Sequence, residues 1–267
     1  IIIGLTAFFK KGKDAYGIDF TGGQIQEYQF QKPVPIEEMR GLLKEAKISD
    51  AAIQQFKEDP RIIMLRTPGD TADTVSQKIK EGFKDNPAQV LRIEKVGPVA
   101  GKELQQKAIL ALSLSLLVIL IYVAFRFKHF NFAIAGIIAL FHDILITVGV
   151  LALTNRQIDL LIVTALLTIA GYSINDTIVI YDRVRENLRL RHKLSLAEVI
   201  NLSVNQTLSR TILTSGVTLF VVIAMFFWGG AVLHNFAFSL LVGFISGVYS
   251  TVFIASPLVL AWAKRSK

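Results

Sequence analysis

The sequence predicts a polytopic α-helical membrane protein that carries a small α+β domain outside the membrane. Hydrophobic residues make up 52% of the 267 residues, and the mean hydropathy is +0.49, which is too apolar for a soluble chain of this length. The apolar residues are concentrated in the second half, whereas residues 10–103 have the mixed composition of a soluble domain. The chain therefore divides into a membrane region and one external domain.

The predicted membrane helices are five apolar runs, at residues 108–125, 130–153, 160–181, 211–233 and 236–263. Each is close to or above the ~18 to 20 residues needed to cross about 30 Å of hydrocarbon. Residues 1–9 are apolar too, but a helix of that length reaches only about half way across. We expect residues 1–9 to be the remnant of a first transmembrane helix rather than a signal peptide, because a basic start and a small-residue cleavage site are missing.

The basic residues predict the orientation, because Lys and Arg of short loops collect on the cytoplasmic side. They follow the first and third apolar runs and recur near the end of the chain: Arg126, Lys128, Arg183, Arg185, Arg189, Arg191, Lys193, Arg210, Lys264, Arg265 and Lys267. We therefore expect residues 10–103 to lie outside the membrane. In the membrane region 104–267, we expect a cytoplasmic loop at 182–210 and a cytoplasmic C-terminus. The net charge of +8 then reflects topology and gives no reason to expect nucleic-acid binding.

The external segment has the pattern of a ferredoxin-like domain. An alternating strand pattern ends at Phe30, helices fit 36–47 and 71–84, a hairpin fits 51–56 and 61–66, and a last strand fits 89–96. The order βαββαβ places the first and last strands side by side and antiparallel, so that both ends of the domain emerge together. The chain has no Cys, so this domain must be held by its core without disulfides.

The third apolar run contains an acid, Asp176, beside Asn175. A charged side chain at the centre of a membrane helix costs about 2.5 to 3.5 kcal/mol on insertion scales, and such residues often mark ion pathways. Ion movement is therefore one hypothesis. The alternative is structural: Asp176 lies near the charged end of its run, where it can reach the interface, and Tyr172 and Ser173 can satisfy it. Thr168 extends a polar stripe on the same helix.

A second intramembrane acid, Asp143, lies in the middle of the 130–153 run with His142 beside it. We expect His142 to be a hydrogen-bonded packing residue, and a relay role and a structural role remain open for Asp143. The sequence contains no metal-ligand spacing, nucleophile motif or phosphate loop. We therefore expect no enzyme active site, no metal and no cofactor.

Glycines and a helix cap indicate further architecture. Gly17, Gly22 and Gly23 fit either a tight strand end or a hinge at the membrane. Gly243 and Gly247 form a GxxxG pattern, which permits close helix packing within this chain or with a partner. Ser195 and Glu198 fit a capping box that starts an amphipathic cytoplasmic helix before Arg210.

Six motifs occur in order along the chain: GIDFTGG (17–23), KVGPVAG (95–101), ALFHD (139–143), GYSINDTIVIYDRVREN (171–187), NQTLSRTILTS (205–215) and YSTVFIASP (249–257). Together they resemble the SecF family of the resistance-nodulation-division (RND) superfamily over essentially the whole chain. The resemblance implies an RND-type six-helix half-bundle in a bacterial or archaeal cytoplasmic membrane. The sequence departs from the family pattern at its start, where most of the first helix is missing.

The resemblance also implies a function. Proteins of this family pair with SecD, associate with the SecYEG translocon, and use the proton-motive force to help draw an unfolded preprotein across the membrane. The acid of the family's NDT motif and the Arg of its SRT motif are implicated in proton passage, and they match Asp176 and Arg210. Because an Arg stays charged, Arg210 suits a counter-ion or gate better than a proton carrier.

Two functional classes remain open. In the first, the chain is half of a proton-driven transporter. In the second, it is a non-transporting assembly subunit of a translocon complex, whose polar membrane residues only bind neighbouring helices. Half of a small-molecule RND exporter is a weaker third hypothesis, because residues 10–103 are too few for the large external regions of those pumps.

The orientation can be tested by single Cys substitutions in this Cys-free chain. We expect Glu37→Cys and Asn155→Cys to react with a membrane-impermeant thiol reagent added outside intact cells, whereas Lys193→Cys reacts only after the cells are opened. Labelling of Lys193→Cys in intact cells would reverse the assigned orientation.

Overall fold

A computed structural model describes residues 1–48, 51–56, 59–67, 71–127 and 130–265. The chain divides into two compact units, one of residues 16–107 and one of residues 1–15 together with 108–267. Among the described residues, five helices are long and apolar enough to cross a membrane, as judged by length and composition.

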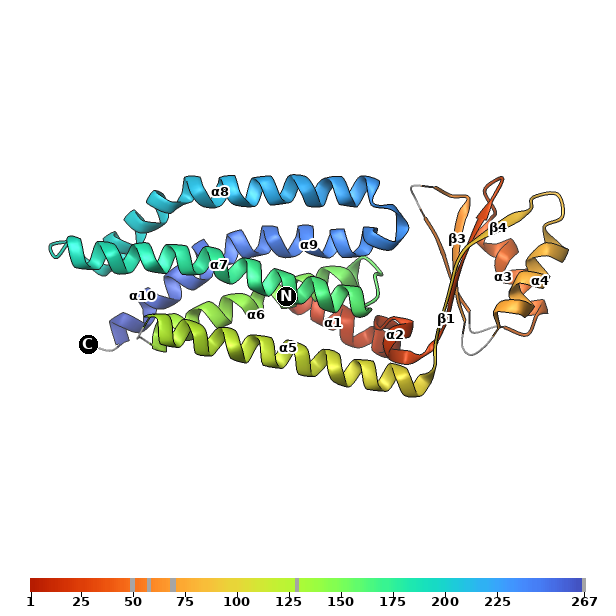
Figure 1. Ribbon diagram of the computed structural model, residues 1–267, viewed down its shortest axis with the longest axis horizontal. Coiled ribbons are helices and arrows are strands. Elements are labelled where there is room, and N and C mark those ends of the chain that lie inside the picture. The colour runs from red at the N-terminus through yellow and green to blue at the C-terminus, as the bar shows by residue number, and fades with distance from the viewer. Residues whose placement is uncertain (49–50, 57–58, 68–70, 128–129, 266–267) are drawn as a thin grey trace. The chain divides into compact units, whose positions relative to one another are not determined.

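The smaller unit is a four-stranded antiparallel sheet with helices on one face (Figure 1). Its elements are α2 (Ile18–Thr21), β1 (Gly23–Phe30), α3 (Ile36–Glu45), β2 (Ala52–Gln55), β3 (Ile62–Thr67), α4 (Ala72–Gly82) and β4 (Ala88–Val96). The strand order β2-β3-β1-β4 places β1 beside β4, antiparallel, as the ferredoxin-like pattern predicts. Residues 57–58 of the expected hairpin turn lie outside the described residues.

The core of this unit joins the sheet to the two longer helices. Tyr28 of β1 and Leu65 of β3 are buried with Met39 of α3 and Ile79 of α4 in one cluster. The strand β3 buries alternate residues, as the sequence pattern predicts, whereas the central strand β1 is buried along most of its length. The domain is therefore held by its core and its sheet without disulfides, in keeping with its lack of Cys.

Both glycines at the start of β1 adopt left-handed backbone conformations. The φ angle is 73° at Gly22 and 122° at Gly23, and a Cβ on Gly23 would lie 2.9 Å from the carbonyl oxygen of Thr67. A Cβ on Gly22 would lie 2.9 Å from the Cα of Pro98. Gly17 precedes α2 with an extended backbone. Close backbone packing within this unit thus accounts for Gly22 and Gly23.

The membrane unit contains α1 (Ile2–Lys11), the short η1 (Gly12–Ala15), α6 (Phe130–Leu153), α7 (Leu160–Leu190), α8 (Leu196–Trp228), α9 (Gly230–Ser250), the π-helical η2 (Thr251–Ala255) and α10 (Ser256–Arg265). The helix α5 (Pro98–Phe127) begins in the smaller unit and supplies the first complete span. The helix α7 contacts α6, α8 and α9, so it lies at the centre of this bundle (Figure 1).

Segment 182–210, which the sequence predicts as the cytoplasmic connection between two spans, is helical except for residues 191–195. The helix α7 continues to Leu190, and α8 begins at Leu196. The predicted capping box is present, with the Ser195 side chain bonded to the backbone of Glu198 and the Glu198 side chain returning to Ser195. The amphipathic helix that it starts runs without interruption into the membrane span.

Glycines set two close helix contacts in the membrane unit. A Cβ on Gly4 of α1 would lie 2.6 Å from the Cα of Gly149 on α6. On α9, a Cβ on Gly243 would overlap the buried side chain of Ile169 on α7, and one on Gly247 would lie 3.1 Å from the Cβ of Ser173. The GxxxG pattern therefore packs α9 against α7 within this chain.

We expect Gly243→Ala to lower the free energy of unfolding by about 1 to 3 kcal/mol, because the added methyl group overlaps Ile169 in a packed interface. Gly216→Ala is the matched control, since nothing lies within 4 Å of its added Cβ on the membrane helix α8. Thermal unfolding in detergent measures both. Equal stability of the two variants would show that α7 and α9 do not pack as described.

Candidate functional site

The most heavily hydrogen-bonded acid of the membrane unit is Asp143, in the middle of α6. It is 0% exposed, and it accepts hydrogen bonds of 2.7 Å from three serine hydroxyls: Ser173 of α7 and Ser246 and Ser250 of α9. His142 Nδ1 lies 3.1 Å from Asp143 Oδ1. One carboxylate thus joins three membrane helices.

This cluster satisfies a group that is otherwise expensive to bury. A hydrogen bond to a charged group contributes about 1.5 to 3 kcal/mol, and an unsatisfied buried polar group costs a comparable amount. Because each hydroxyl comes from a helix that packs against α6 or α7, separating the helices would leave both the carboxylate and the hydroxyls without partners. Asp143 therefore fixes how α6, α7 and α9 pack.

Further hydroxyl groups continue this polar interior along α7 and α9. The Thr177 hydroxyl donates to the carbonyl oxygen of Ser173 at 3.3 Å and lies 2.9 Å from the Thr251 hydroxyl of η2. Ser256 donates to the carbonyl oxygen of Thr251 at 3.0 Å, in the π-helical turn before Pro257. Irregular helix hydrogen bonding is satisfied by side-chain hydroxyls at this position.

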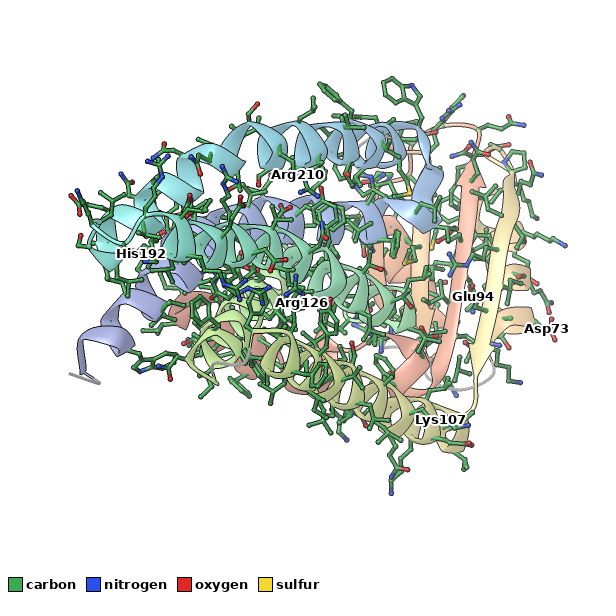
Figure 2. The ribbon with its side chains drawn as sticks, turned by 60° about the vertical axis from the view of Figure 1, so that its left-hand side comes forward. Asp73, Glu94, Lys107, Arg126, His192 and Arg210 are labelled. Atoms are coloured by element: carbon green, nitrogen blue, oxygen red, sulfur yellow. The ribbon has the colours of Figure 1, made fainter. Side chains whose placement is uncertain are left out.

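The second acid, Asp176, lies between α7 and α8. It is 4% exposed, and its Oδ2 accepts one long hydrogen bond of 3.3 Å from Ser215 of α8. Arg210 is also on α8 (Figure 2), and it is exposed. No ion pair within 4.0 Å between Arg210 and Asp176 is found among the described residues.

The side of α8 that packs on α7 carries a row of buried hydroxyl groups. Ser203, Thr207, Thr211 and Ser215 recur every four residues, and all four are buried. The Ser203 hydroxyl accepts a 2.9 Å hydrogen bond from Asn187 of α7. Within the described part of the chain, the buried Thr211 hydroxyl has no hydrogen-bond partner. The row runs from Asp176 toward the end of the membrane span.

The other residues singled out from the sequence lie apart from the two carboxylates. The Tyr172 hydroxyl donates to Thr218 of α8 at 3.2 Å, and its ring packs on Phe244 of α9. Thr168 is exposed and donates to the carbonyl oxygen of Thr164 on its own helix at 2.9 Å. Asn175 is also exposed. The structure therefore brings neither Thr168 nor Asn175 to Asp176 or Asp143.

The sequence reasoning missed most of the hydroxyl partners. The hydroxyl residues of α8 could have been found from the sequence, because they recur every four positions within one helix: Ser203, Thr207, Thr211 and Ser215. The partners of Asp143 carry a weaker signal, because Ser246 and Ser250 lie beside the GxxxG glycines rather than near the acid in sequence. Among the described residues, no group of three or more His, Cys, Asp or Glu side chains is placed to hold a metal ion.

Comparison with known proteins gives a consistent result. The family described as "Protein export membrane protein SecD/SecF, C-terminal" matches residues 75–265. The chain is 44% identical over 261 residues to the protein translocase subunit SecF of Desulfurispirillum indicum, covering 94% of this chain and 82% of the relative. It is 38% identical over 268 residues to SecF of Endomicrobium trichonymphae, covering 98% of this chain and 86% of the relative.

Solved structures of SecDF agree with this relationship. The crystal structure of SecDF from Thermus thermophilus, a translocon-associated membrane protein, is similar with a TM-score of 0.90 and 39% identity. SecDF in a super-membrane-facing form is similar with a TM-score of 0.72 and 38% identity. The two comparisons cover 98% and 99% of this chain, but only 36% of each SecDF chain.

The sequence identity, the family match and the fold agree along nearly the whole chain. The expected fold of long apolar helices with a small four-stranded antiparallel α+β domain is confirmed, and the chain is a multi-pass membrane protein. The chain belongs to the SecF family of protein translocase subunits, the SecF part of the SecDF protein-export machinery.

Proposed function

We propose that this chain couples proton movement to preprotein export, with Asp176 as the proton-binding group and Arg210 as its counter-charge. The observation that supports this most is the contrast between the two buried acids. Asp176 has one hydrogen bond of 3.3 Å, whereas Asp143 has three of 2.7 Å. Asp176 therefore has only one hydrogen bond to lose on a change of charge, whereas Asp143 is held by hydroxyls of two other helices.

The two carboxylates therefore have different roles in this proposal. Asp176 exchanges its proton, while Asp143 is a positioning residue that holds Ser173, three residues before Asp176 on the same helix. A charge-assisted hydrogen bond is worth about 1.5 to 3 kcal/mol, so three of them keep Asp143 in a single arrangement. Movement of α7 on α8 is then possible without loss of the α6, α7 and α9 packing.

The hydroxyl row on α8 supplies a route for the proton. Ser215 contacts Asp176, Thr211 has a hydroxyl without a partner in the described residues, and Ser203 contacts Asn187. Asn187 also donates to Gln206, which is exposed. A buried polar group without a partner is a site where water binds. Together with water, the row connects Asp176 to the basic end of α7 and α8.

The energetic scale fits a conformational change. Moving one elementary charge through 100 mV supplies about 2.3 kcal/mol. Protonation of Asp176 removes the attraction of Arg210, and a change of a few kcal/mol is enough to shift a two-state equilibrium.

SecD is the proposed partner, and SecYEG and an unfolded preprotein are the proposed translocon and substrate. Thr164, Thr168 and Asn175 form an exposed polar stripe on α7, and polar groups in a membrane helix favour a protein neighbour over lipid. The related SecDF is described as translocon-associated. The proposed location is the cytoplasmic membrane, with residues 10–103 outside and the end of the chain in the cytoplasm.

A second candidate function is a non-transporting assembly subunit. The Asp143 cluster favours it, because this intramembrane acid serves helix packing. The two functions differ in what Asp176 does: a transporter loses coupling when Asp176 is neutralised, whereas an assembly subunit loses assembly or nothing.

We expect Asp176→Asn to assemble with SecD normally and to abolish the stimulation of export by the proton-motive force, because it mimics a permanently protonated site. Arg210→Ala is also expected to lose the stimulation of export by the proton-motive force, since it removes the counter-charge of Asp176. Proton flux and preprotein export in vesicles containing SecD and SecYEG measure both effects. Asp182→Asn is the matched control, because it removes one carboxylate from the half-exposed side of the same helix. Wild-type flux and stimulation in Asp176→Asn would exclude the relay role.

We expect Asp143→Ala to lower the free energy of unfolding by about 3 to 5 kcal/mol, because it leaves three buried hydroxyls without their acceptor. Ser246→Ala is expected to cost about 1 to 2 kcal/mol. Thr168→Ala is the control and changes the stability by less than about 0.5 kcal/mol, since its hydroxyl is exposed. Thermal unfolding in detergent measures the series, and an Asp143→Ala protein as stable as the control would contradict the packing role.

A further inference from the structure

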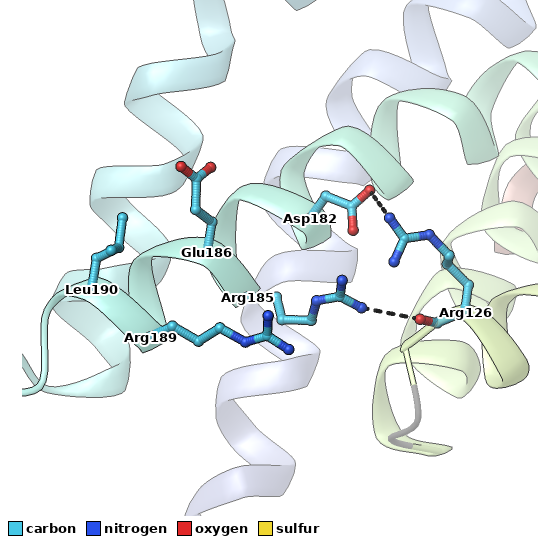
Figure 3. Close-up of a pocket in the computed structure, with 6 residues that line it drawn as sticks. All are labelled: Arg126, Asp182, Arg185, Glu186, Arg189 and Leu190. Atoms are coloured by element: carbon cyan, nitrogen blue, oxygen red, sulfur yellow. Dashed lines mark hydrogen bonds and ion pairs between the residues drawn. The ribbon is translucent and has the colours of Figure 1, made fainter.

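A cleft lies at the end of α7, next to the last turn of α5, and its volume is about 440 Å³ (Figure 3). It is lined by Arg126, Asp182, Arg185, Glu186, Arg189 and Leu190. The lining residues thus include three arginines and two acids. None of these residues takes part in the buried Asp143 or Asp176 contacts described above.

Both carboxylates of the cleft already have an arginine partner. Asp182 Oδ2 lies 2.8 Å from Arg126 Nη2, and Glu186 Oε2 lies 2.6 Å from Nη1 of Arg183, outside the cleft. Figure 3 shows the Glu186 side chain pointing away from the side of α7 that carries Arg185 and Arg189. The acids thus neutralise Arg126 and Arg183 rather than the other two arginines.

Arg185 and Arg189 are left with unused donors. Arg185 Nη1 donates to the carbonyl oxygen of Arg126 at 3.2 Å, and within the described residues the Arg189 side chain makes no hydrogen bond or ion pair. The two guanidinium groups are four residues apart on α7 and lie on the same side of it (Figure 3). Like charges at this spacing destabilise a helix unless an anion lies between them.

A second cavity of about 550 Å³ shares Arg126 and Arg185 with the cleft and is lined also by Ala124 and Phe125. Phe125 is 85% exposed, and it belongs to the apolar face of the first complete membrane span. An apolar surface thus adjoins the two arginines directly. This combination suits a ligand with an anionic end and a hydrocarbon chain.

The cleft also lies at the right depth for a lipid headgroup. Arg126 is the first charged residue after the apolar run of α5. The helix α7 has 31 residues, and its length of about 46 Å exceeds the ~30 Å of hydrocarbon. Arg185 and Arg189, in its last two turns, are therefore at the boundary between hydrocarbon and headgroups. Basic pockets at this level of the cytoplasmic leaflet bind anionic lipids.

We propose that this cleft binds the phosphate-bearing headgroup of an anionic phospholipid, with Arg185 and Arg189 on the phosphate and an acyl chain along Phe125. A guanidinium group forms paired hydrogen bonds to phosphate oxygens, which an ammonium group does not. The site is independent of the proposed proton function, since it uses neither Asp176 nor Arg210. Lipid bound here links the end of α5 to the end of α7.

The test uses the full chain in complex with SecD, transferred from lipid nanodiscs into native mass spectrometry. The nanodiscs contain phosphatidylcholine with phosphatidylglycerol or cardiolipin, and a parallel sample contains phosphatidylcholine with added inorganic phosphate. The double variant Arg185→Gln and Arg189→Gln is compared with Arg191→Gln and Lys193→Gln. This control removes the same number of positive charges, two, from exposed positions next to the cleft.

We expect the complex to retain anionic lipid, and the Arg185 and Arg189 variant to lower its occupancy on the order of tenfold while the control lowers it by less than about threefold. An equal loss of lipid occupancy in both double variants would show a general attraction of anionic lipid to the basic surface, and it would overturn the proposed site. Retention of inorganic phosphate in the lipid's place would show a free-phosphate site and overturn the lipid assignment. A wild-type complex that retains no anionic lipid would also refute the proposal. Co-purification with SecD confirms that each variant is folded.

Discussion

A buried carboxylate in a membrane needs hydrogen-bond donors from its neighbours, and this requirement organises the bundle. Asp143 is fully buried in α6 and accepts hydrogen bonds from α7 and α9. Three hydrogen bonds of 2.7 Å therefore fix the position of these helices along one another. The small residues beside these donors, Gly243 and Gly247, let α9 approach α7 closely enough for the serines to reach. Polar satisfaction and small-residue packing are therefore parts of one interface.

This arrangement gives α7 two faces whose buried acids differ in their hydrogen bonding. Toward α6 and α9 it is fixed by the Asp143 cluster and by the contact of Gly243 with Ile169. Toward α8, Asp176 accepts one long hydrogen bond, from Ser215, while Tyr172 and Asn187 hydrogen-bond to α8 at other positions. A change of charge at Asp176 therefore disturbs few hydrogen bonds of its own carboxylate, while the contacts of Asp143 keep their geometry. The proposed proton coupling depends on this difference.

Much of the fold follows from local sequence patterns. The apolar runs predicted the membrane spans, and the strand and helix periods predicted the antiparallel sheet with β1 beside β4. The capping box of Ser195 and Glu198 was also predictable, since it depends on residues three apart. The continuity of the helix after this cap was not predictable in the same way. A cap marks where a helix begins, but no local signal marks that α8 continues through residue 210 into the membrane span.

The candidate site was predictable in its acids and not in their partners. An acid within an apolar run is conspicuous because its insertion is costly, which identified Asp143 and Asp176. Ser246 lies 103 residues from Asp143, and its hydroxyl is matched to that carboxylate only by the packing of α9. The same limit applies to Thr168 and Asn175, whose side of α7 is exposed. Periodicity shows which residues share a face, but not which neighbour the face meets.

The central claim is that Asp176 carries the exchangeable proton while Asp143 holds the helices together. Infrared difference spectroscopy of the complex with SecD, recorded across a pH step, measures carboxyl groups directly as they gain or lose a proton. The account predicts a protonated-carboxyl band that is absent in Asp176→Asn and present in Asp143→Asn. A band that persists in Asp176→Asn and disappears in Asp143→Asn would contradict it.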